Sequence, residues 1–499
     1  MSWGGLAPLV ILLSSLVPAL LIFFLDESRV RLRNGLNLGG AVLKVSVVGV
    51  MLWGVYRGWR FQLSWELLPG VSFLLRIDSL SLLFMTLSAV LWLLTTIYAI
   101  GYLADRPHNR RFFGFFCLCV AATVGISMAG NLFTLFIFYE LLTLSTYPLV
   151  VHRGDNASLR AGAVYLAYTL TGSMAVLAGT VWLYALVGPV DFVEQGGILV
   201  AAPEQRASLT LILALLIGGF SVKAALVPLH GWLPRAMAAP APVSALLHAV
   251  AVVKAGAFGI LRVVYDLYGA ELAHQLGVLA VLLAFAAATI VYGSVRALFQ
   301  TDIKRRLAYS TVSQVSYILL GTALFGSVAT VGALVHLVHQ GVMKITMFFC
   351  AGAVAETLGV HRVDELDGTG PRMPWTMTAF TIAALAMIGL PPFAGFISKW
   401  YLGVGALEAG AAWVVGVLLL SSLLNAAYFL PMLYRAWFKA PPAAWPQEAT
   451  TPGSWEAPPS LVLPPALTAF FSLAFGVLAG TAISPLQWAQ FIAALEYAP

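Results

Sequence analysis

Charged residues are scarce in this sequence. Asp, Glu, Lys and Arg make up 10% of its 499 residues, whereas they make up about 25% of a soluble globular chain. Hydrophobic residues make up 60%. This balance excludes a soluble enzyme, and it predicts an integral, all-α membrane protein in contact with the lipid bilayer.

The sequence also lacks the motifs that bind nucleotides or carry electrons. It contains no CxxC cluster for an iron–sulfur centre, no GxGxxG opening a helix after a strand, and no Walker A loop. We therefore expect no cofactor, and the driving energy would come from an ion gradient or a partner subunit. The formal net charge of +6 does not indicate nucleic acid, because the basic residues lie mostly in short loops between apolar runs.

Cysteine is rare, and it offers little to a metal ion. Cys117, Cys119 and Cys350 are the three cysteines, and each lies within an apolar run. We interpret them as small, buried hydrophobic residues. A metal pair at Cys117 and Cys119 is the weaker alternative, because no histidine or acidic residue lies beside it.

Apolar runs of about 20 residues, the length needed to cross a bilayer, fill most of the chain. We predict about fourteen membrane-spanning helices on this rule. The first run follows an N-terminus without positive charge, so we expect a retained span and no cleaved signal peptide. The spans are predicted at residues 6–25, 36–56, 78–103, 112–128, 132–152, 161–187, 209–229, 243–265, 276–298, 306–325, 328–356, 375–401, 411–437 and 461–483.

Basic residues gather in alternate loops, which predicts the orientation of the chain. We expect the strongly basic loops to face the cytoplasm across the plasma membrane of a prokaryotic cell. An even number of spans then places both termini outside. The basic set consists of Arg29, Arg31, Arg33, Arg106, Arg110, Arg111, Arg153, Arg160, Arg235, Lys304, Arg305, Arg306, Arg362, Arg372, Arg435 and Lys439.

Two lysines lie where hydrocarbon is expected, Lys223 in the seventh predicted span and Lys254 near the middle of the eighth. A charged lysine at mid-membrane costs roughly 2.5–3.5 kcal/mol, and a buried lysine binds and releases protons readily. Snorkelling to the interface is the alternative, but it suits only residues near span ends. Pro228 breaks its helix just past Lys223, and broken backbone at this depth is tolerated only inside protein or beside water. We therefore predict an ion path.

Glu140 lies well inside the fifth predicted span. An isolated buried carboxylate would take up a proton and lose its charge. One interpretation is a carboxylate satisfied by Tyr139 or Thr143 for helix packing. The interpretation that we favour is an ion pair with Lys223, whose field changes when a proton arrives or leaves.

Histidines accompany these lysines. In a continuous helix, His248 would lie about 120° around the axis from Lys254 and about 9 Å along it. His248 alone could equally be a satisfied core residue, but beside two lysines we expect a proton relay. His336 and His339 share one face of the eleventh span, and Lys344 follows. Because histidine titrates near pH 6.5, we favour a relay over a metal site at this pair.

A second helix break precedes another lysine. Pro391 and Pro392 interrupt the twelfth span, and Lys399 follows. This order reverses that of Lys223 and Pro228, and paired broken helices are the usual sequence pointer to an inverted-repeat transporter. Lys399 could be the last titrating group before an aqueous exit or an interfacial lysine, and we favour the exit. Asp302 and Lys304 lie at a cytoplasmic helix start, where they could also be ordinary solvated charges.

These motifs together resemble a known family. FYELLTLSTYPLV, VKAALVPLHGWLPRAMAAPAPVSALLHA, DIKRRLAYSTVSQ, HLVHQGVMKITMFFCAG and GLPPFAGFISKWYL are similar to segments of the antiporter-like subunits shared by respiratory complex I, Mrp-type Na⁺/H⁺ antiporters and membrane-bound hydrogenases. The resemblance implies a fourteen-helix core with two inverted five-helix repeats and broken seventh and twelfth helices. It divides the chain into residues 1–111, a first repeat at 112–267, a second at 274–438, and a loop with the last helix at 439–499.

The resemblance also implies roles for the buried charges. Glu140 would pair with Lys223, Lys254 would be the central relay lysine, and Lys399 the distal one. Asp302 and Lys304 would lie where the halves or neighbouring subunits meet. His248, His336 and His339 would belong to the hydrated chain between the lysines.

Within this family the chain is most similar to the D-type subunit of Mrp-like antiporters. This implies a transporter subunit, not an enzyme, that exchanges protons for Na⁺ or another monovalent cation together with other membrane subunits. The alternative is a proton-pumping subunit, without redox centres of its own, in a complex I-type oxidoreductase or a membrane-bound hydrogenase.

Overall fold

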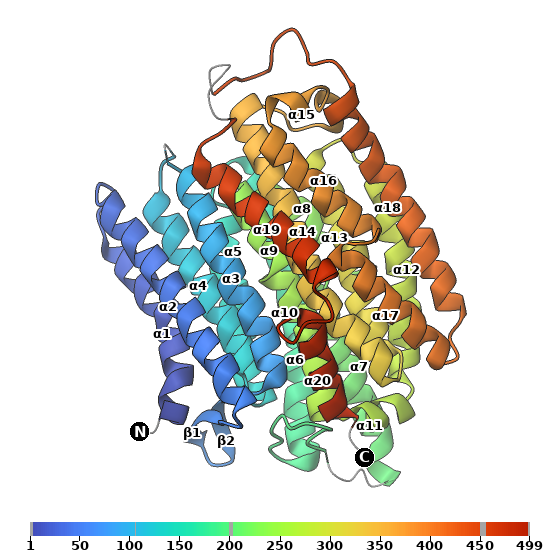
Figure 1. The fold of residues 1–499 in the computed structure, drawn as a ribbon. Helices are drawn as coiled ribbons and strands as arrows, with labels where there is room; N and C mark the ends of the chain where they lie inside the picture. The colour runs from blue at the N-terminus through green and yellow to red at the C-terminus, as the bar shows by residue number, and fades with distance from the viewer. Residues whose placement is uncertain (1–2, 105, 199–202, 450–455, 498–499) are drawn as a thin grey trace.

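Long helices lie side by side through most of the molecule (Figure 1). The computed structural model describes residues 3–104, 106–198, 203–449 and 456–497. The start of α1 and the end of α20 lie at the same end of the bundle (Figure 1), as an even number of crossings requires. The helices of the first half are α1 Trp3–Phe24, α2 Val30–Tyr56, α3 Ser79–Tyr102, α4 Asn109–Met128, α5 Leu132–Val150, α6 Asn156–Val187, α7 Arg206–Lys223, α8 Trp232–Arg235, α9 Ala241–Ala249 and α10 Val252–Leu261.

The second half continues the bundle with helices of similar length. A π-helix, η3 Arg262–Leu267, extends α10, and short 3-10 turns lie at Pro203–Gln205, Ala236–Ala238 and Val363–Glu365. The remaining helices are α11 Ala270–Gln275, α12 Val278–Leu298, α13 Ile303–Ala323, α14 Ser327–Leu358, α15 Thr369–Arg372, α16 Pro374–Ile388, α17 Ala394–Glu408, α18 Trp413–Phe438, α19 Pro459–Val477 and α20 Pro485–Glu496.

Among the described residues, 12 helices are long and apolar enough to cross a membrane. The two other predicted spans are different in kind. α13 has the length, but its sequence IKRRLAYSTVSQVSYILLGTA is rich in charged and hydroxyl side chains, and the twelfth span is split into α16 and α17, with 15 residues each. The protein is therefore a multi-pass membrane bundle of 12 to 14 apolar helices.

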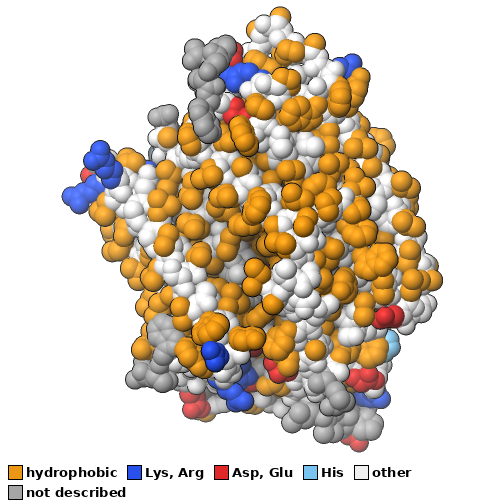
Figure 2. All heavy atoms as spheres, in the orientation of Figure 1, with side chains coloured by type: hydrophobic (Ala, Val, Ile, Leu, Met, Phe, Trp, Pro, Cys, Tyr) orange, Lys and Arg blue, Asp and Glu red, His pale blue; other side chains and the backbone are white. Residues whose placement is uncertain are grey.

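The surface of the bundle supports this assignment. Figure 2 shows hydrophobic side chains over the middle of the visible face, while Lys, Arg, Asp and Glu gather toward its two ends. Large apolar side chains such as Leu423 and Phe470 are 70% and 59% exposed. Exposed apolar area of this extent is expected of a surface that faces lipid.

Both predicted helix breaks are present. α7 ends at Lys223, and Ala225, with φ of 59°, turns the chain away, while the indole of Trp232 donates a 2.8 Å hydrogen bond to the Val222 carbonyl. α16 ends at Ile388, and Gly389, with φ of 94°, adopts the left-handed conformation common at helix ends. The division into two inverted repeats stays a prediction.

The fold is all-α as predicted, apart from one hairpin that was not predicted from the sequence. Strands β1 Phe61–Leu68 and β2 Val71–Ile77 form an antiparallel hairpin at the end of the bundle where α1 begins (Figure 1). The segment connects two spans and is too short to cross a bilayer. Its alternating apolar residues Phe61, Leu63 and Trp65, followed by Pro69–Gly70 at the turn, are the strand signal that a search for long apolar runs passes over.

The predicted eighth span also differs from expectation. It is not a continuous helix, because α9 ends at Ala249 and α10 begins at Val252, with Val250 and Ala251 outside helical geometry. The sequence carries no proline or glycine at this point, so its composition gave no sign of the interruption. α20 is a further helix that the sequence did not predict.

Candidate functional site

The candidate site is organised around α14, which packs against α3, α9, α13, α16, α17, α19 and α20. It carries His336, His339, Gln340 and Lys344, all with no exposed surface. Residues three and four positions apart share a helix face, so His336 and His339 lie on one face as predicted, and Gln340 lies on the same face. The structure thus encloses α14 with neighbouring helices and buries its polar face.

Lys344 is held by α13. Its Nζ donates a 2.6 Å hydrogen bond to Ser310 Oγ and a longer one, 3.4 Å, to the Leu307 carbonyl. A second lysine, Lys254 on α10, is equally buried, but its Nζ has no hydrogen-bond partner among the described residues. A buried ammonium without a partner is unstable, so Lys254 would be stabilised by a water molecule at this position or by loss of its proton.

The histidines are not equivalent. His336 Nδ1 lies 2.8 Å from Ser398 Oγ and its Nε2 lies 3.1 Å from the Gln314 carbonyl. Both ring nitrogens of His339 lack a partner among the described residues, and so do those of His248, whose ring stacks on Phe348 at 4.5 Å. His336 is therefore fixed in orientation by hydrogen bonds, whereas His248 and His339 are fixed by packing alone.

The expected geometry between His248 and Lys254 was wrong. His248 lies on α9 and Lys254 on α10, and the interruption at Val250–Ala251 separates them. The rotation and rise of a regular helix do not apply across such an interruption.

The predicted ion pair between Glu140 and Lys223 is not formed in this structure. Lys223 Nζ donates a 2.6 Å hydrogen bond to the Tyr139 carbonyl and lies 3.2 Å from the centroid of the Tyr139 ring. No ion pair within 4.0 Å joins Lys223 to a carboxylate in the described parts of the chain, and Glu140 Oε1 is buried without a partner. Lys223 is therefore bound to the helix that carries Glu140, one residue away from it. The packing interpretation also fails in part, because Thr143 donates to the Tyr139 carbonyl and not to Glu140.

Lys399 lies in α17, and its ammonium group reaches the end of α16 at the helix break. Its Nζ donates to the carbonyls of Ile388 (2.7 Å) and Met387 (3.3 Å) and to Ser422 Oγ (2.8 Å). The last carbonyls of a helix have no partner within the helix and carry its negative dipole end, so they are suited to hold an ammonium group. The break thus creates the binding place for Lys399, which is partly buried.

Asp302 and Lys304 join two parts of the chain. The Asp302 carboxylate caps α13 by accepting a 2.8 Å hydrogen bond from the Arg305 amide. Lys304 Nζ donates at 2.7 Å to the Ala239 carbonyl, which precedes α9. Both line a cavity of about 540 Å³ together with Arg153, Arg160 and Arg235. Lys304 is thus more than a solvated charge, because it connects the second predicted repeat to the first.

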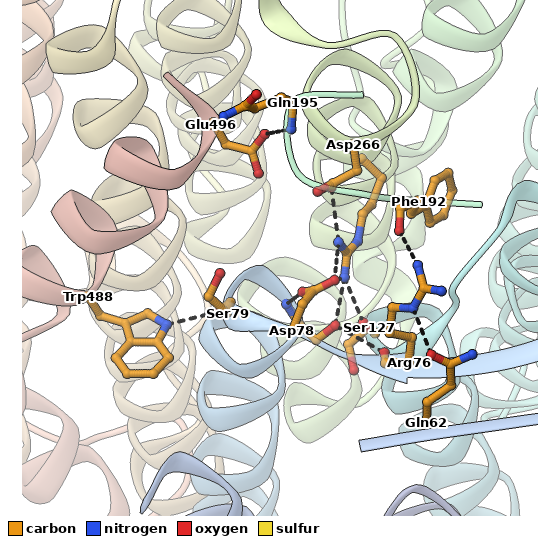
Figure 3. A network of polar contacts seen from close by, with 12 residues as sticks. Gln62, Arg76, Asp78, Ser79, Ser127, Phe192, Gln195, Asp266, Trp488 and Glu496 are labelled. Carbon is orange, nitrogen blue, oxygen red and sulfur yellow. Dashed lines mark hydrogen bonds and ion pairs between the residues drawn. The ribbon is translucent and has the colours of Figure 1, made fainter. Parts of the chain in front are cut away.

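A network of charges at the opposite end was missed by sequence reasoning. Arg262 of η3 has no exposed side-chain surface, and it forms ion pairs with Asp78 (2.8 Å) and Asp266 (3.0 Å). Figure 3 shows Asp78 and Asp266 in this network, with Phe192 bonded to Arg76 and Gln195 bonded to Glu496 nearby. The sequence signal that could have revealed this network is Arg262 itself, because it is a charged residue inside the predicted eighth span. Its ion-pair partner Asp266 follows four residues later.

Burial and charge act in opposite directions on the carboxylates of this network. Burial raises the pKa of Asp78, but the charge of Arg262 together with hydrogen bonds from Arg262 and Ser81 holds this pKa below its ordinary value. Burial raises the pKa of Glu496 above its ordinary value, and nearby Asp266 adds to the rise. Glu496 accepts a 2.9 Å hydrogen bond from the Gln195 amide (Figure 3).

The remaining buried lysine and the three cysteines lie outside the groups described above. Lys44 of α2 donates to Ser15 Oγ at 2.8 Å and lies 4.5 Å from the Trp92 ring. Cys117, Cys119 and Cys350 are buried free thiols. Within the described residues, no group of three or more His, Cys, Asp or Glu side chains is placed to hold a metal ion.

Comparisons with known proteins identify the family of this chain. The sequence of residues 129–425 matches the family described as NADH:quinone oxidoreductase/Mrp antiporter, transmembrane region. The chain belongs to this family. Residues 69–113 match a second family, described as the N-terminus of chain 5 of NADH-ubiquinone oxidoreductase (complex I).

The relatives include subunits of NADH-quinone oxidoreductases and subunits of cation/proton antiporters. The chain is 37% identical to the N-type subunit of the NADH-quinone oxidoreductase of Desulforudis audaxviator, over 92% of this chain and 93% of the relative. It is 26% identical to the D-type subunit of the Na⁺/H⁺ antiporter of Bacillus subtilis, over 93% and 92%. Four further relatives are longer, and the chain spans 40% to 61% of their length.

The fold has a close counterpart among solved structures. A chain of the Mrp complex from Dietzia sp. superposes with a TM-score of 0.87 at 24% identity, covering 100% of this chain and 98% of that one. The protein therefore has the fold of an antiporter-like subunit of the complex I/Mrp family.

Proposed function

We propose that this protein is a proton-translocating subunit of a multisubunit membrane complex. The observation that carries this proposal is a set of lysines inside the bundle: Lys223, Lys254 and Lys344 are buried, and Lys399 is partly buried. Three of them, Lys223, Lys254 and Lys399, lie on helices that end or begin at an interruption. Ionisable residues inside a membrane protein are costly, and they mark ion or proton pathways. Their number and placement exceed what helix packing requires.

Protons would pass along the middle of the bundle. The path would start at Glu140 and Lys223 and end at Lys399. Between them, His336 of α14 lies near both Lys254 and Lys399, and His248 lies near Lys344. Buried polar atoms without a protein partner are normally satisfied by water, and such atoms recur along this path: Lys254 Nζ, both nitrogens of His248 and His339, and the side-chain amides of Gln314 and Gln340. Water at these positions would complete the relay.

Glu140 and Lys223 would act as a switch at the start of the path. Lys223 is bound to the Tyr139 carbonyl, so rotation of its flexible side chain can exchange this partner for the adjacent Glu140 carboxylate. Protonation of Lys254 would compete with the Glu140–Lys223 pair. Proton entry and opening of the pair would thereby be coupled.

The energy source has two candidates. The first is exchange of a monovalent cation, with Na⁺ as the first ion to test, in an Mrp-like complex; the similarity to the D-type subunit of a Na⁺/H⁺ antiporter supports it. The second is electron transfer in partner subunits, as in a complex I-type oxidoreductase; the 37% identity to the N-type subunit of an NADH-quinone oxidoreductase favours it. The second candidate requires partner subunits that carry the electrons, because this sequence contains no redox motif.

Transport assays distinguish the two energy sources when they use everted membrane vesicles from cells that express the whole operon. A pH gradient is established, and its collapse is measured on adding Na⁺, K⁺ or Li⁺. Collapse by a cation without any electron donor supports the antiporter. Acidification of the vesicles on adding NADH or another donor, with no response to cations, supports the redox-driven pump. Absence of both responses in a complex shown to be assembled would contradict proton translocation.

A further inference from the structure

A series of hydrogen-bonded side chains connects Lys344 with Lys399. It starts at Lys344, whose Nζ donates to Ser310 Oγ at 2.6 Å. The Tyr428 hydroxyl of α18 lies 2.9 Å from the same Ser310 oxygen and also forms a short hydrogen bond with Asn425 Oδ1. Lys344, Ser310, Tyr428 and Asn425 have no exposed surface, so bulk water does not compete for these bonds.

The far end of the series meets Lys399 at one backbone oxygen. Asn425 Nδ2 donates to the Met387 carbonyl at 3.1 Å, and Lys399 Nζ donates to the same carbonyl at 3.3 Å. Met387 lies in the last turn of α16, next to the break. The two lysines are therefore linked through one carbonyl and three side chains from α13 and α18, and none of these three was singled out by the sequence.

The Tyr428 hydroxyl can adopt two states. It carries one hydrogen and has two acceptors within reach, Ser310 Oγ and Asn425 Oδ1. While Lys344 is an ammonium it can only donate, so Ser310 accepts from it and turns its own hydrogen to Tyr428, which then donates to Asn425. When Lys344 is neutral its Nζ becomes an acceptor, Ser310 donates to it, and Tyr428 turns its hydrogen to Ser310.

The second state changes the surroundings of Lys399. Asn425 Oδ1 then loses its donor, and a buried acceptor without a donor is unfavourable. A protonated Lys399, which already shares the Met387 carbonyl with Asn425, is the nearest cation of the series. Loss of a proton at Lys344 thus favours a proton on Lys399, and the coupling is reciprocal.

On this geometry we propose that Tyr428 and Asn425 are positioning residues that couple the protonation of Lys344 to that of Lys399. This inference rests on the proposed proton translocation. The other titratable or charged groups around the series are His248 near Lys344, His336 and Tyr317 near Lys399, and Arg306, which donates to the Tyr428 backbone carbonyl at 2.9 Å. None of them is hydrogen-bonded to the hydroxyls of the series.

The test measures proton transport by the assembled complex in everted vesicles. Tyr428→Phe removes the hydroxyl and keeps the ring, and we expect transport to fall on the order of tenfold or more, as when a positioned proton-transfer group is lost. Tyr434→Phe is the matched control, because Tyr434 is 54% exposed on the same helix. We expect this control to transport at the wild-type rate.

Ser310 provides a second, independent pair of variants. Ser310→Ala breaks the series and should lower transport as Tyr428→Phe does, whereas Ser310→Thr keeps a hydroxyl and should restore most of the rate. The double variant Ser310→Ala/Tyr428→Phe should be no slower than either single variant, because both interrupt one series. A purely structural role would not be rescued by threonine.

Three outcomes would overturn the inference while leaving the proposed function intact: wild-type transport in Tyr428→Phe, equal loss in Ser310→Ala and Ser310→Thr, or additive losses in the double variant. In each case Lys254→Ala must still abolish transport. If Lys254→Ala transports normally, the proposed function itself fails.

Discussion

Lys223 Nζ binds the carbonyl oxygen of Tyr139 at 2.6 Å, although the next residue along α5 is the carboxylate Glu140. The lysine thus contacts the residue beside Glu140 but forms no ion pair with Glu140 in this structure. A carbonyl and a carboxylate as alternative partners for one ammonium group form a simple two-state element. The account of coupling given above depends on Glu140 carrying a charge in one of these states.

Replacing Glu140 by Gln removes that charge with little change in volume. We expect proton transport to fall on the order of tenfold or more, with the complex still assembled, because Lys223 loses its alternative partner. Glu408→Gln at the exposed end of α17 is the control and should leave transport unchanged. Normal transport in Glu140→Gln would show that the pair has no part in the path.

Gly389 makes room for Lys399. A Cβ at this position would lie 2.7 Å from Lys399 Cδ and 3.1 Å from its Nζ, and φ is 94°, a conformation that costs other residues about 1–2 kcal/mol. Gly389→Ala should therefore displace the ammonium from the carbonyls of α16 and lower transport. Gly403→Ala, where nothing lies within 4 Å of the new Cβ, is the control in α17. Equal rates in the two variants would mean that the carbonyl site of Lys399 is not needed.

Asp78 should contribute strongly to stability. Asp78→Asn keeps an acceptor for the Ser81 amide that it caps but leaves the fully buried Arg262 with Asp266 alone. Removing one partner of a buried ion pair costs about 3 kcal/mol or more, which thermal unfolding of the purified protein in detergent would detect. Asp155→Asn is the control, since Asp155 caps α6 in the same way and forms no ion pair in the described structure. A similar decrease in both variants would assign the effect to capping.

Glu496 predicts how stability changes with pH. Because burial raises its pKa above the ordinary value of 4.5, the folded state holds this proton more tightly than the unfolded state. Stability should therefore fall as pH rises above about 4.5. Glu496→Gln should flatten this part of the melting-temperature profile between about pH 5 and pH 8, whereas Glu271→Gln at an exposed site should follow wild type. A profile unchanged by Glu496→Gln would contradict a raised pKa.

Length and polarity allowed the sequence to predict the spans and the charges inside them. Lys223, Lys254, Lys344 and Lys399 were recognised because each is a charge within an apolar run, and Pro391–Pro392 marked the break beside Lys399. What the sequence could not supply were partners distant in the chain. Arg262 and Asp78 are separated by 184 residues, and no periodicity within either segment points to the other.

The interruption of the eighth span could not be predicted from the sequence for a different reason. The interruption at Val250–Ala251 occurs within an apolar run, and only the packing of α9 and α10 against other helices reveals it. The direct Glu140–Lys223 pair was expected from charge alone, but the Tyr139 carbonyl and ring offer Lys223 a competing site at the same depth. Such competition depends on side-chain placement, which the sequence does not specify.

Substitution of Lys254 is the most direct test of a proton path through the buried lysines, because Lys44 provides a control at an equally buried lysine. Both lysines are buried without exposed surface, but Lys44 has Ser15 and Trp92 as partners whereas Lys254 Nζ has none among the described residues. Proton transport should be measured in everted vesicles for Lys254→Ala and Lys44→Met, after confirming that each complex is assembled. We predict that Lys254→Ala abolishes transport and that Lys44→Met preserves it. Transport at the wild-type rate in Lys254→Ala would contradict a proton path through the buried lysines.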